Sequence, residues 1–332
     1  MSAVMITGAR GYIATALAER LSAEGHRLRL VSRALRRPPA ARFPENQAEY
    51  VAADLRTPET WLRLLNDVDA VMHLSSRTDL HAAEANPHED YELNVEPARA
   101  LIHAARELKR AIPVIFASTV TIVGSAPPLP VSDTTDDQPC SVYDRHKLDC
   151  ETMLLEATRE AVLNACSLRL SNVYGYGSGV ASINSNRGIL NAAMRHAVQG
   201  RALTLYGNGA YVRDFTFVGD VVDAFCRALA SKEVLNGGHY VIASGCGHTL
   251  AEAFELVAQE TLLCTGRAIE IRRVSEPSDL HSIERRNFVG NSTRFQKLAG
   301  WRPQVDLRSG IRDYFERCLA ASPTSGAPNE AA

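Results

Sequence analysis

Short apolar segments alternate with longer segments of helical periodicity over the first half of the chain. In the longer segments apolar residues recur every three or four positions, which predicts helices over 12–24, 94–109 and 143–161. A further helix is expected to open at Thr57, with Pro58 at its first position. The apolar segments of strand length are 4–6, 28–31, 50–53, 69–74, 114–117 and 166–170. Strands that alternate with helices in this way predict an α/β fold with a doubly wound parallel sheet.

A glycine-rich turn, residues 7–14, lies between the first predicted strand and the first predicted helix. Gly8 permits a tight turn, Gly11 allows a pyrophosphate to approach the backbone, and the small Ala14 lets the helix pack closely on the strand. The N–H groups and the dipole of the following helix favour phosphate. This strand–turn–helix context predicts a dinucleotide site. The residues expected around the phosphates are Gly8, Arg10, Gly11, Tyr12 and Ile13.

The regular alternation ends near Ser171, where the sequence becomes irregular and rich in Gly and Asn. We therefore expect a Rossmann-like dinucleotide-binding domain over 1–172, to which 214–245 returns. A smaller C-terminal substrate-binding lobe is expected from 173–213 and 246–318. Residues 319–332 are expected to form a disordered tail, since Ala, Ser, Pro and Gly dominate there without periodicity.

The end of the second predicted strand bears on the choice of cofactor. NAD sites usually place Asp or Glu there for the ribose 2′-hydroxyl, but this chain has Ser32 and Arg33, with Arg36 and Arg37 beyond them. A guanidinium pairs well with a 2′-phosphate, and Ser32 can add a hydrogen bond. We therefore predict NADP, with NAD as the alternative.

A tyrosine and a lysine stand one helical turn apart in a predicted helix. Tyr143 has an ordinary pKa near 10, and the ammonium of Lys147 together with the positive nicotinamide ring would favour its phenolate. Upstream, Ser118 and Thr119 end a strand at the sheet edge where ligands bind in such folds. The Thr119 hydroxyl could hold a substrate carbonyl oxygen beside Tyr143, which predicts acid–base catalysis.

Composition adds few constraints. Apolar residues make up 45% of the chain, charged residues 22%, and the formal net charge is −2, which gives no reason to expect nucleic acid or an anionic membrane as a partner. The seven cysteines are scattered, and no apolar run approaches the roughly 20 residues of a membrane span, so a cytoplasmic protein with reduced thiols is predicted.

No metal site is expected, because His81, His88, Glu84 and Asp90 lack the spacing of metal ligands. Asn94 is expected to tie strands together through its side chain.

These motifs together resemble the extended short-chain dehydrogenases/reductases, the NAD-dependent epimerase/dehydratase family. The resemblance runs from Met5 to about Pro303. It is carried by 7–14, 54–55, 73–76, 94–95, 118–119, Tyr143 with Lys147, 169–175, 206–209 and 213–215.

The resemblance implies a role for individual residues. Thr119 would be the catalytic hydroxyl, Tyr143 the proton donor, and Lys147 the ribose-binding residue that lowers the pKa of the tyrosine. Asp54 would meet the adenine, and Ser75 would lie along the cofactor. Other cofactor contacts would come from Ser32, Arg33, Leu55, Leu74, Ser76, Ser118 and Leu170. Contacts with a nucleotide sugar would come from Thr119, Asn172, Arg187, Tyr206 and Arg213, of which Asn172 and Arg213 would hold the diphosphate. Relatives dimerise through a bundle that includes the tyrosine-bearing helix, so a homodimer is predicted.

The reaction is narrowed by further comparison with the family. The related dehydratases carry Asp-Glu after the catalytic threonine, where this chain has Val120 and Thr121, so dehydration is not expected. The segments 117–120, 143–148, 187–190 and 276–280 resemble dTDP-4-keto-6-deoxyhexose 4-ketoreductases of natural-product (antibiotic) deoxysugar biosynthesis. We therefore predict NADPH-dependent reduction of a C4 ketone. The alternatives are a nucleotide-sugar epimerase with retained NAD and, third, a non-catalytic NADP-binding sensor.

Two departures from these relatives affect the predicted sugar site. Val123 stands where many relatives have tyrosine, four residues after the catalytic hydroxyl. Glu276 stands where many have an arginine before Pro-Gly-Asp, and that arginine would meet the diphosphate. Arg187, Arg285 or Arg286 could substitute for it.

Overall fold

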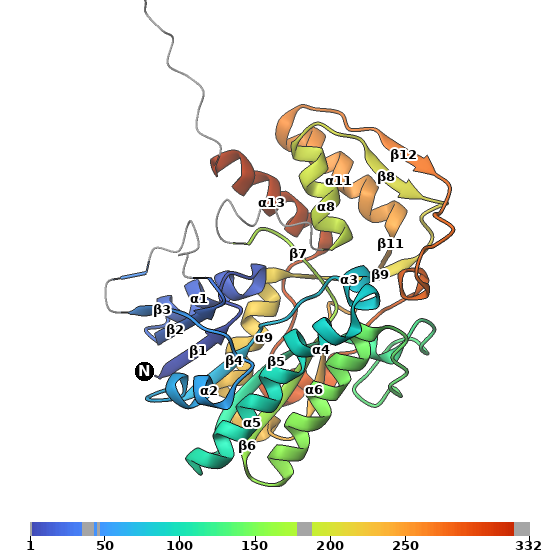
Figure 1. The fold of residues 1–332 in the computed structure, drawn as a ribbon. Coiled ribbons are helices and arrows are strands. Elements are labelled where there is room, and N and C mark those ends of the chain that lie inside the picture. Colours follow the sequence, from blue (N-terminus) through green and yellow to red (C-terminus); the bar gives the residue numbers. More distant parts are fainter. Residues whose placement is uncertain (1, 35–42, 45–46, 178–187, 322–332) are drawn as a thin grey trace, which may run out of the picture.

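The structure, a computed structural model, describes residues 2–34, 43–44, 47–177 and 188–321. Within these ranges, seven parallel strands form one sheet with helices on both faces, as the alternation of strands and helices predicted (Figure 1). In sheet order the strands are β10 (His239–Ile242), β6 (Leu163–Leu170), β5 (Ile112–Thr119), β4 (Ala70–His73), β1 (Ala3–Thr7), β2 (Arg27–Ser32) and β3 (Ala48–Ala52).

The direction of winding reverses between β1 and β4, which are neighbours in the sheet. From β1 the chain adds β2 and β3 on one side, and from β4 it adds β5 and β6 on the other. Thr7 at the end of β1 is in register with His73 at the end of β4. Ligands of open α/β sheets bind outside the carboxyl ends of the strands at such a reversal.

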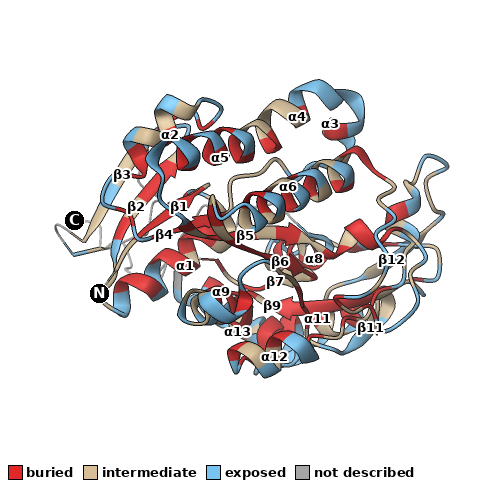
Figure 2. Cartoon of the chain, turned by 90° about the horizontal axis from the view of Figure 1, so that it is seen from below, coloured by how far each residue is buried: buried red, intermediate tan, exposed pale blue. Residues whose placement is uncertain are grey.

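Two layers of helices cover the sheet. One apolar core joins one face of the sheet to α1 (Tyr12–Ala23), α9 (Val218–Ala230) and α12 (Thr293–Ala299). A second core joins the other face to α2 (Pro58–Leu64), α5 (Glu96–Leu108) and α6 (Val142–Arg159). Figure 2 shows the strands as a mostly buried layer between these helices. The predicted helix start at Thr57 and Pro58 is confirmed, since Thr57 is the N-cap of α2.

A second lobe has its own core. It contains α8 (Ile189–Val198), α11 (Leu250–Thr265) and α13 (Leu307–Ala321), which lie together at one end of the sheet (Figure 1). Two small sheets complete it: β11 (Gly247–Thr249), β9 (Val212–Phe217) and β7 (Asn172–Tyr174), and β12 (Ile271–Val274) with β8 (Leu203–Tyr206). Because β6 ends at Leu170 and β7 begins at Asn172, this lobe begins at the carboxyl edge of the main sheet.

Two predicted boundaries differ from the structure. The helix expected over 94–109 is α5, and it is preceded by α3 (Leu80–Ala85) and α4 (Pro87–Asn94), which the apolar pattern did not reveal because α4 buries Asp90 and Asn94. Residues 319–321 were expected to belong to the disordered tail but are the last residues of α13, and residues 322–332 lie outside the described residues. The remaining short helices are α10 (Lys232–Leu235) and the 3-10 turns η1 (Val120–Val123) and η2 (Ser282–Arg285). None of the described helices has the length and apolarity needed to cross a bilayer.

Candidate active site

The glycine turn after β1 is packed closely against neighbouring backbone at both glycines. Gly8 has a φ of +65°, and a Cβ added there would lie 2.9 Å from Leu74 O and 2.9 Å from Ser75 N. The N–H of Gly11 donates to Gly8 O at 2.7 Å, and a Cβ at Gly11 would lie 2.9 Å from that oxygen. No side chain caps the N-terminus of α1, so its first N–H groups remain available to an anion. The turn therefore fits a dinucleotide pyrophosphate.

Thr7 joins the ends of β1 and β4 beside this turn. Its Oγ1 accepts hydrogen bonds from Leu74 N at 3.1 Å and Ser75 N at 3.0 Å, and it lies 2.8 Å from Nδ1 of His73. Burial, and secondarily the charge of Lys147, lowers the pKa of His73 to about 3, so this ring is neutral. Thr7 thereby fixes the backbone of Leu74 and Ser75, where the resemblance places the cofactor.

The predicted adenosine end forms a pocket with several cationic side chains. Its lining includes Arg56 and Arg77 and residues that the sequence predicted as cofactor contacts: Ser32, Arg33, Asp54, Leu55, Ser75 and Ser76. Arg56 donates hydrogen bonds to the Asp54 carboxylate from Nη2 at 2.6 Å and from Nε at 3.0 Å. These hydrogen bonds lower the pKa of Asp54. Arg36 and Arg37 lie outside the described residues. The pocket is therefore polar and locally positive, although the chain is nearly neutral.

The predicted catalytic residues come from β5 and α6. Thr119 is the last residue of β5, and Tyr143 lies in the first turn of α6. Lys147 Nζ donates to Ala117 O at 2.8 Å and lies 5.9 Å from the centre of the Tyr143 ring. Burial lowers the pKa of Lys147 to about 8. The buried Ser118 Oγ, one residue before Thr119, has no hydrogen-bond partner within the described part of the chain.

Thr121 and Asp144 adjoin these residues, although no motif of the sequence pointed to them. Thr121 Oγ1 lies 2.8 Å from Thr119 Oγ1, and Thr121 donates a short hydrogen bond to Oδ1 of Asp144. Asp144 directly follows Tyr143 and is buried. The sequence signal that could have identified this cluster was the position of Asp144 in the predicted helix. Asp144 lies three residues before Lys147 and therefore on the same helix face.

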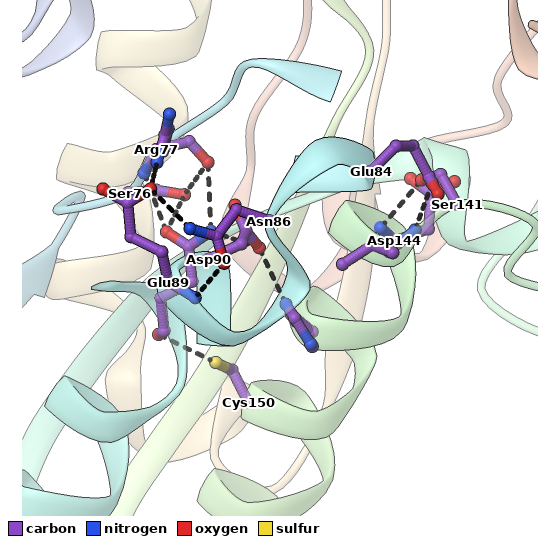
Figure 3. A network of polar contacts seen from close by, with 12 residues as sticks. Ser76, Arg77, Glu84, Asn86, Glu89, Asp90, Ser141, Asp144 and Cys150 are labelled. Atoms are coloured by element: carbon purple, nitrogen blue, oxygen red, sulfur yellow. Dashed lines mark hydrogen bonds and ion pairs between the residues drawn. The ribbon is translucent and has the colours of Figure 1, made fainter. Parts of the chain in front are cut away.

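Helix α4 connects the cofactor loop to α6. Asn94 Oδ1 accepts hydrogen bonds from Ser76 Oγ at 3.0 Å and from Arg77 N at 2.7 Å. Asn94 Nδ2 donates at 3.0 Å to Asp90, whose Oδ2 lies 2.7 Å from Nδ1 of His146 on α6. Figure 3 shows this polar network running from Ser76 and Arg77 towards α6. Asn94 therefore holds a loop to a helix, and the prediction that it ties strands together is wrong.

A pair of arginines lies beside Asn172 at the junction with the second lobe. Arg213 is buried, and its guanidinium donates to the carbonyl oxygens of Val212, Glu284 and Arg286. Arg286 Nη2 donates to Asn172 Oδ1 at 3.4 Å, and its buried Nε has no partner among the described residues. Burial lowers the pKa of both guanidiniums, that of Arg213 to about 9, where the charge of Arg286 contributes. Two neighbouring cations, the buried Arg213 and the half-buried Arg286, can bind a dianion such as a diphosphate.

The structure does not place the other predicted substrate residues, Tyr206 and Arg187, beside Asn172 and Arg213. Tyr206 ends β8 with 43% of its surface exposed, and Arg187 lies outside the described residues. Arg285, another candidate substitute, is exposed and lies 3.6 Å from Glu276. Of the three candidate substitutes for the absent arginine, Arg286 is the one that contacts Asn172 within the described ranges.

Comparisons with known proteins agree with this arrangement. The model of the NAD dependent epimerase/dehydratase family matches residues 4–243. A UDP-glucose 4-epimerase of Mycolicibacterium smegmatis is 27% identical over 316 residues, which cover 94% of this chain and 97% of that protein. A UDP-glucose 4-epimerase of Corynebacterium glutamicum is 24% identical over 348 residues, with 99% of both chains covered. The solved complex of a Thermus thermophilus UDP-glucose 4-epimerase with NAD has a TM-score of 0.81 at 26% identity, covering 96% of this chain and 100% of that one. Because the family model spans most of the sequence, the chain belongs to the NAD-dependent epimerase/dehydratase family, the extended short-chain dehydrogenases/reductases.

Proposed function

We propose that this chain is a nucleotide-sugar epimerase that inverts C4 of a hexose by oxidation followed by reduction. The observation that carries the proposal is that Lys147 lies 5.9 Å from the ring of Tyr143 in α6, with Thr119 at the carboxyl end of β5. The relatives described above are UDP-glucose 4-epimerases, and none of them is a ketoreductase, which favours epimerisation over the reduction predicted from the sequence.

The three residues have separate tasks in this proposal. Thr119 and Tyr143 hold the C4 oxygen of the sugar, and Tyr143 takes its proton on oxidation and returns it on reduction. Lys147 binds the ribose of the cofactor and places a positive charge near the phenol. A nicotinamide dinucleotide held by the glycine turn and Lys147 would supply the hydride acceptor for the oxidation and the hydride donor for the reduction.

The diphosphate of the substrate is assigned to Asn172, Arg213 and Arg286. The charge of the diphosphate would offset the cost of burying two guanidiniums next to each other. Arg286 takes the place of the arginine that relatives carry where this chain has Glu276. The glycine turn and the N-terminus of α1 hold the cofactor pyrophosphate.

A second candidate is an NADPH-dependent 4-ketoreductase of a dTDP-4-keto-6-deoxyhexose. The specific observation in its favour is the adenosine pocket, where Ser32, Arg33, Arg56 and Arg77 would suit a 2′-phosphate. A reductase must bind and release NADPH in every cycle, whereas an epimerase regenerates its NAD.

One experiment separates the two candidates. The protein is purified without added cofactor, its bound nucleotide is identified, and it is incubated with UDP- and dTDP-hexoses and with a dTDP-4-keto-6-deoxyhexose plus NADPH. If the protein is an epimerase, we expect it to carry bound NAD and to form a C4 epimer without a net change in nicotinamide absorbance. Consumption of NADPH by the ketosugar without epimer formation would support the reductase instead, and no conversion of any sugar would contradict both.

We also propose that the chain forms a homodimer through α5 and α6. The exposed residues of α5 include Arg99, His103, Arg106 and Glu107, and those of α6 include Arg145, Asp149, Glu156 and Arg159. Each helix thus presents charges of both signs, which two copies can pair. Sedimentation velocity at micromolar concentration tests this, and a monomer would contradict it.

A further inference from the structure

Asp144 is a buried carboxylate whose burial needs an explanation. It is 1% exposed, and no cation in the described part of the chain lies within ion-pair distance of it. Removing an ionised carboxylate from water is costly unless other groups compensate. Burial lowers the pKa of Arg286, and the charge of Asp144 partly opposes that lowering, so the two groups interact electrostatically, but Arg286 makes no hydrogen bond to Asp144.

Helix capping does not account for this carboxylate. The N-cap of α6 is Ser141, whose Oγ accepts the hydrogen bond of Asp144 N at 3.0 Å. Figure 3 shows Ser141 and Asp144 together at the start of α6, with Glu84 beside them. Glu84 accepts from Val142 N at 2.7 Å. The first turn of α6 is therefore capped without the Asp144 side chain. That side chain accepts a hydrogen bond from the segment after β5 instead.

The Asp144 side chain is directed to the end of β5 through two hydroxyl groups. Thr121 Oγ1 donates to Asp144 Oδ1, so its single proton is committed there while the carboxylate is ionised. The Thr119 hydroxyl, 2.8 Å away, then donates to Thr121 Oγ1 and also accepts from Thr121 N at 3.2 Å. In the substrate-free molecule Thr119 Oγ1 is thus held on two sides. When Thr119 donates to the C4 ketone oxygen, its single proton turns from Thr121 Oγ1 to that oxygen, and Thr121 N continues to donate to Thr119 Oγ1.

We infer that Asp144 is a positioning residue that fixes the Thr119 hydroxyl through Thr121. Because Asp144 adjoins Tyr143 in α6, the path Thr119–Thr121–Asp144 ties the end of β5 to the turn of α6 that carries the phenol. It sets the separation of the two groups that hold the C4 oxygen. Errors of about 1 Å in such a separation can cost around a hundredfold in rate. This inference rests on the proposed function.

The test compares variants that remove a hydrogen bond with variants that keep it. Thr121→Val removes the hydroxyl at nearly constant shape, whereas Thr121→Ser keeps it. Asp144→Ala removes the acceptor, whereas Asp144→Asn keeps an oxygen that Thr121 can reach. Thr261→Val is the matched control, since Thr261 is a fully buried hydroxyl of α11 that donates within its own helix at 2.6 Å.

For Thr121→Val and Asp144→Ala we expect kcat to fall at least about tenfold, with the KM for the nucleotide sugar and the cofactor Kd changed less than about twofold. Thr121→Ser and Asp144→Asn should keep kcat within about threefold of the wild type. Thr261→Val should lower only thermal stability. If Asp144→Ala does not fold, the Thr121 pair still decides the question.

Three outcomes would overturn the inference, and the last is distinguishable from the first two. Undiminished kcat in a folded Thr121→Val protein, or an equal fall in Thr121→Ser, would contradict the positioning role and leave the proposed function intact. A wild-type protein that converts no nucleotide sugar would contradict the proposed function and this inference with it.

Discussion

Arg286 donates a hydrogen bond to Asn172 across 3.4 Å and so joins the segment after η2 to the first residue of β7. The two residues are 114 positions apart in the sequence. Asn172 belongs to the predicted diphosphate site, and Arg286 brings it a half-buried positive charge beside the buried Arg213. Arg286 is therefore the residue that we expect to act in place of the arginine that the sequence lacks at Glu276.

Replacement of Arg286 tests this assignment. Arg286→Gln keeps a donor for Asn172 but removes the charge, so we expect the KM for the nucleotide sugar to rise about tenfold or more, since a charged hydrogen bond is worth roughly 1.5–3 kcal/mol. Cofactor affinity should not change. The matched control is Arg285→Gln, because Arg285 is exposed and lies near Glu276. A larger effect of Arg285→Gln on KM would show that the assignment is wrong.

Tyr143 should be indispensable for turnover and dispensable for cofactor binding. Tyr143→Phe removes the group that exchanges a proton with the C4 oxygen, and we expect kcat to fall by about 10²–10⁴. Binding of the nicotinamide dinucleotide, measured by calorimetry, should change less than about twofold. Tyr91→Phe is the control. Tyr91 lies in α4 and packs on His146 of α6, the helix that also carries Tyr143, at 5.4 Å between ring centres. Comparable losses in both variants would argue against a specific role for Tyr143.

Lys147 should make stability depend on pH in a predictable direction. Burial lowers its pKa from 10.5 to about 8, so between these values the unfolded chain binds the proton and the folded chain does not. The free energy of unfolding of the wild type should therefore rise with pH across this window relative to Lys147→Met, by up to about 3 kcal/mol. Urea unfolding without cofactor, at both ends of the window, measures the difference. Parallel pH dependences in the two proteins would contradict the lowered pKa.

Arg33 should discriminate between the two dinucleotides. It lies in the adenosine pocket directly after β2, where a 2′-phosphate would be recognised. We expect Arg33→Ala to weaken NADP binding about tenfold or more and NAD binding less than about twofold, because only NADP offers the second charge. NAD serves as the internal control. Equal weakening of both dinucleotides would place Arg33 elsewhere on the cofactor.

The sequence predicted the parallel sheet, the glycine turn and the three candidate catalytic residues because each follows from a local pattern. Apolar strands such as 4–6 and one-turn spacing such as that of Tyr143 and Lys147 are visible without tertiary contacts. Helix α4 was missed because its buried residues are Asp90 and Asn94, which give no apolar period.

Other features depend on tertiary contacts. Thr121 and Asp144 meet only because the end of β5 lies against the start of α6, and 23 positions separate them in the sequence. Arg286 reaches Asn172 only after the second lobe folds back onto the main sheet. A single sequence can suggest several arginines for this place, but the packing of β7 and β9 against the segment after η2 selects one.

An isotopic label tests most directly whether this chain moves a hydride at C4 of a nucleotide-bound hexose. A UDP-hexose deuterated at C4 is incubated with the purified protein and NAD, and the products are followed by NMR. We expect the C4 epimer with deuterium retained at C4, because the same hydride leaves and returns. Recovery of the unchanged sugar at stoichiometric protein concentration, with UDP- and dTDP-hexoses alike, would contradict this expectation.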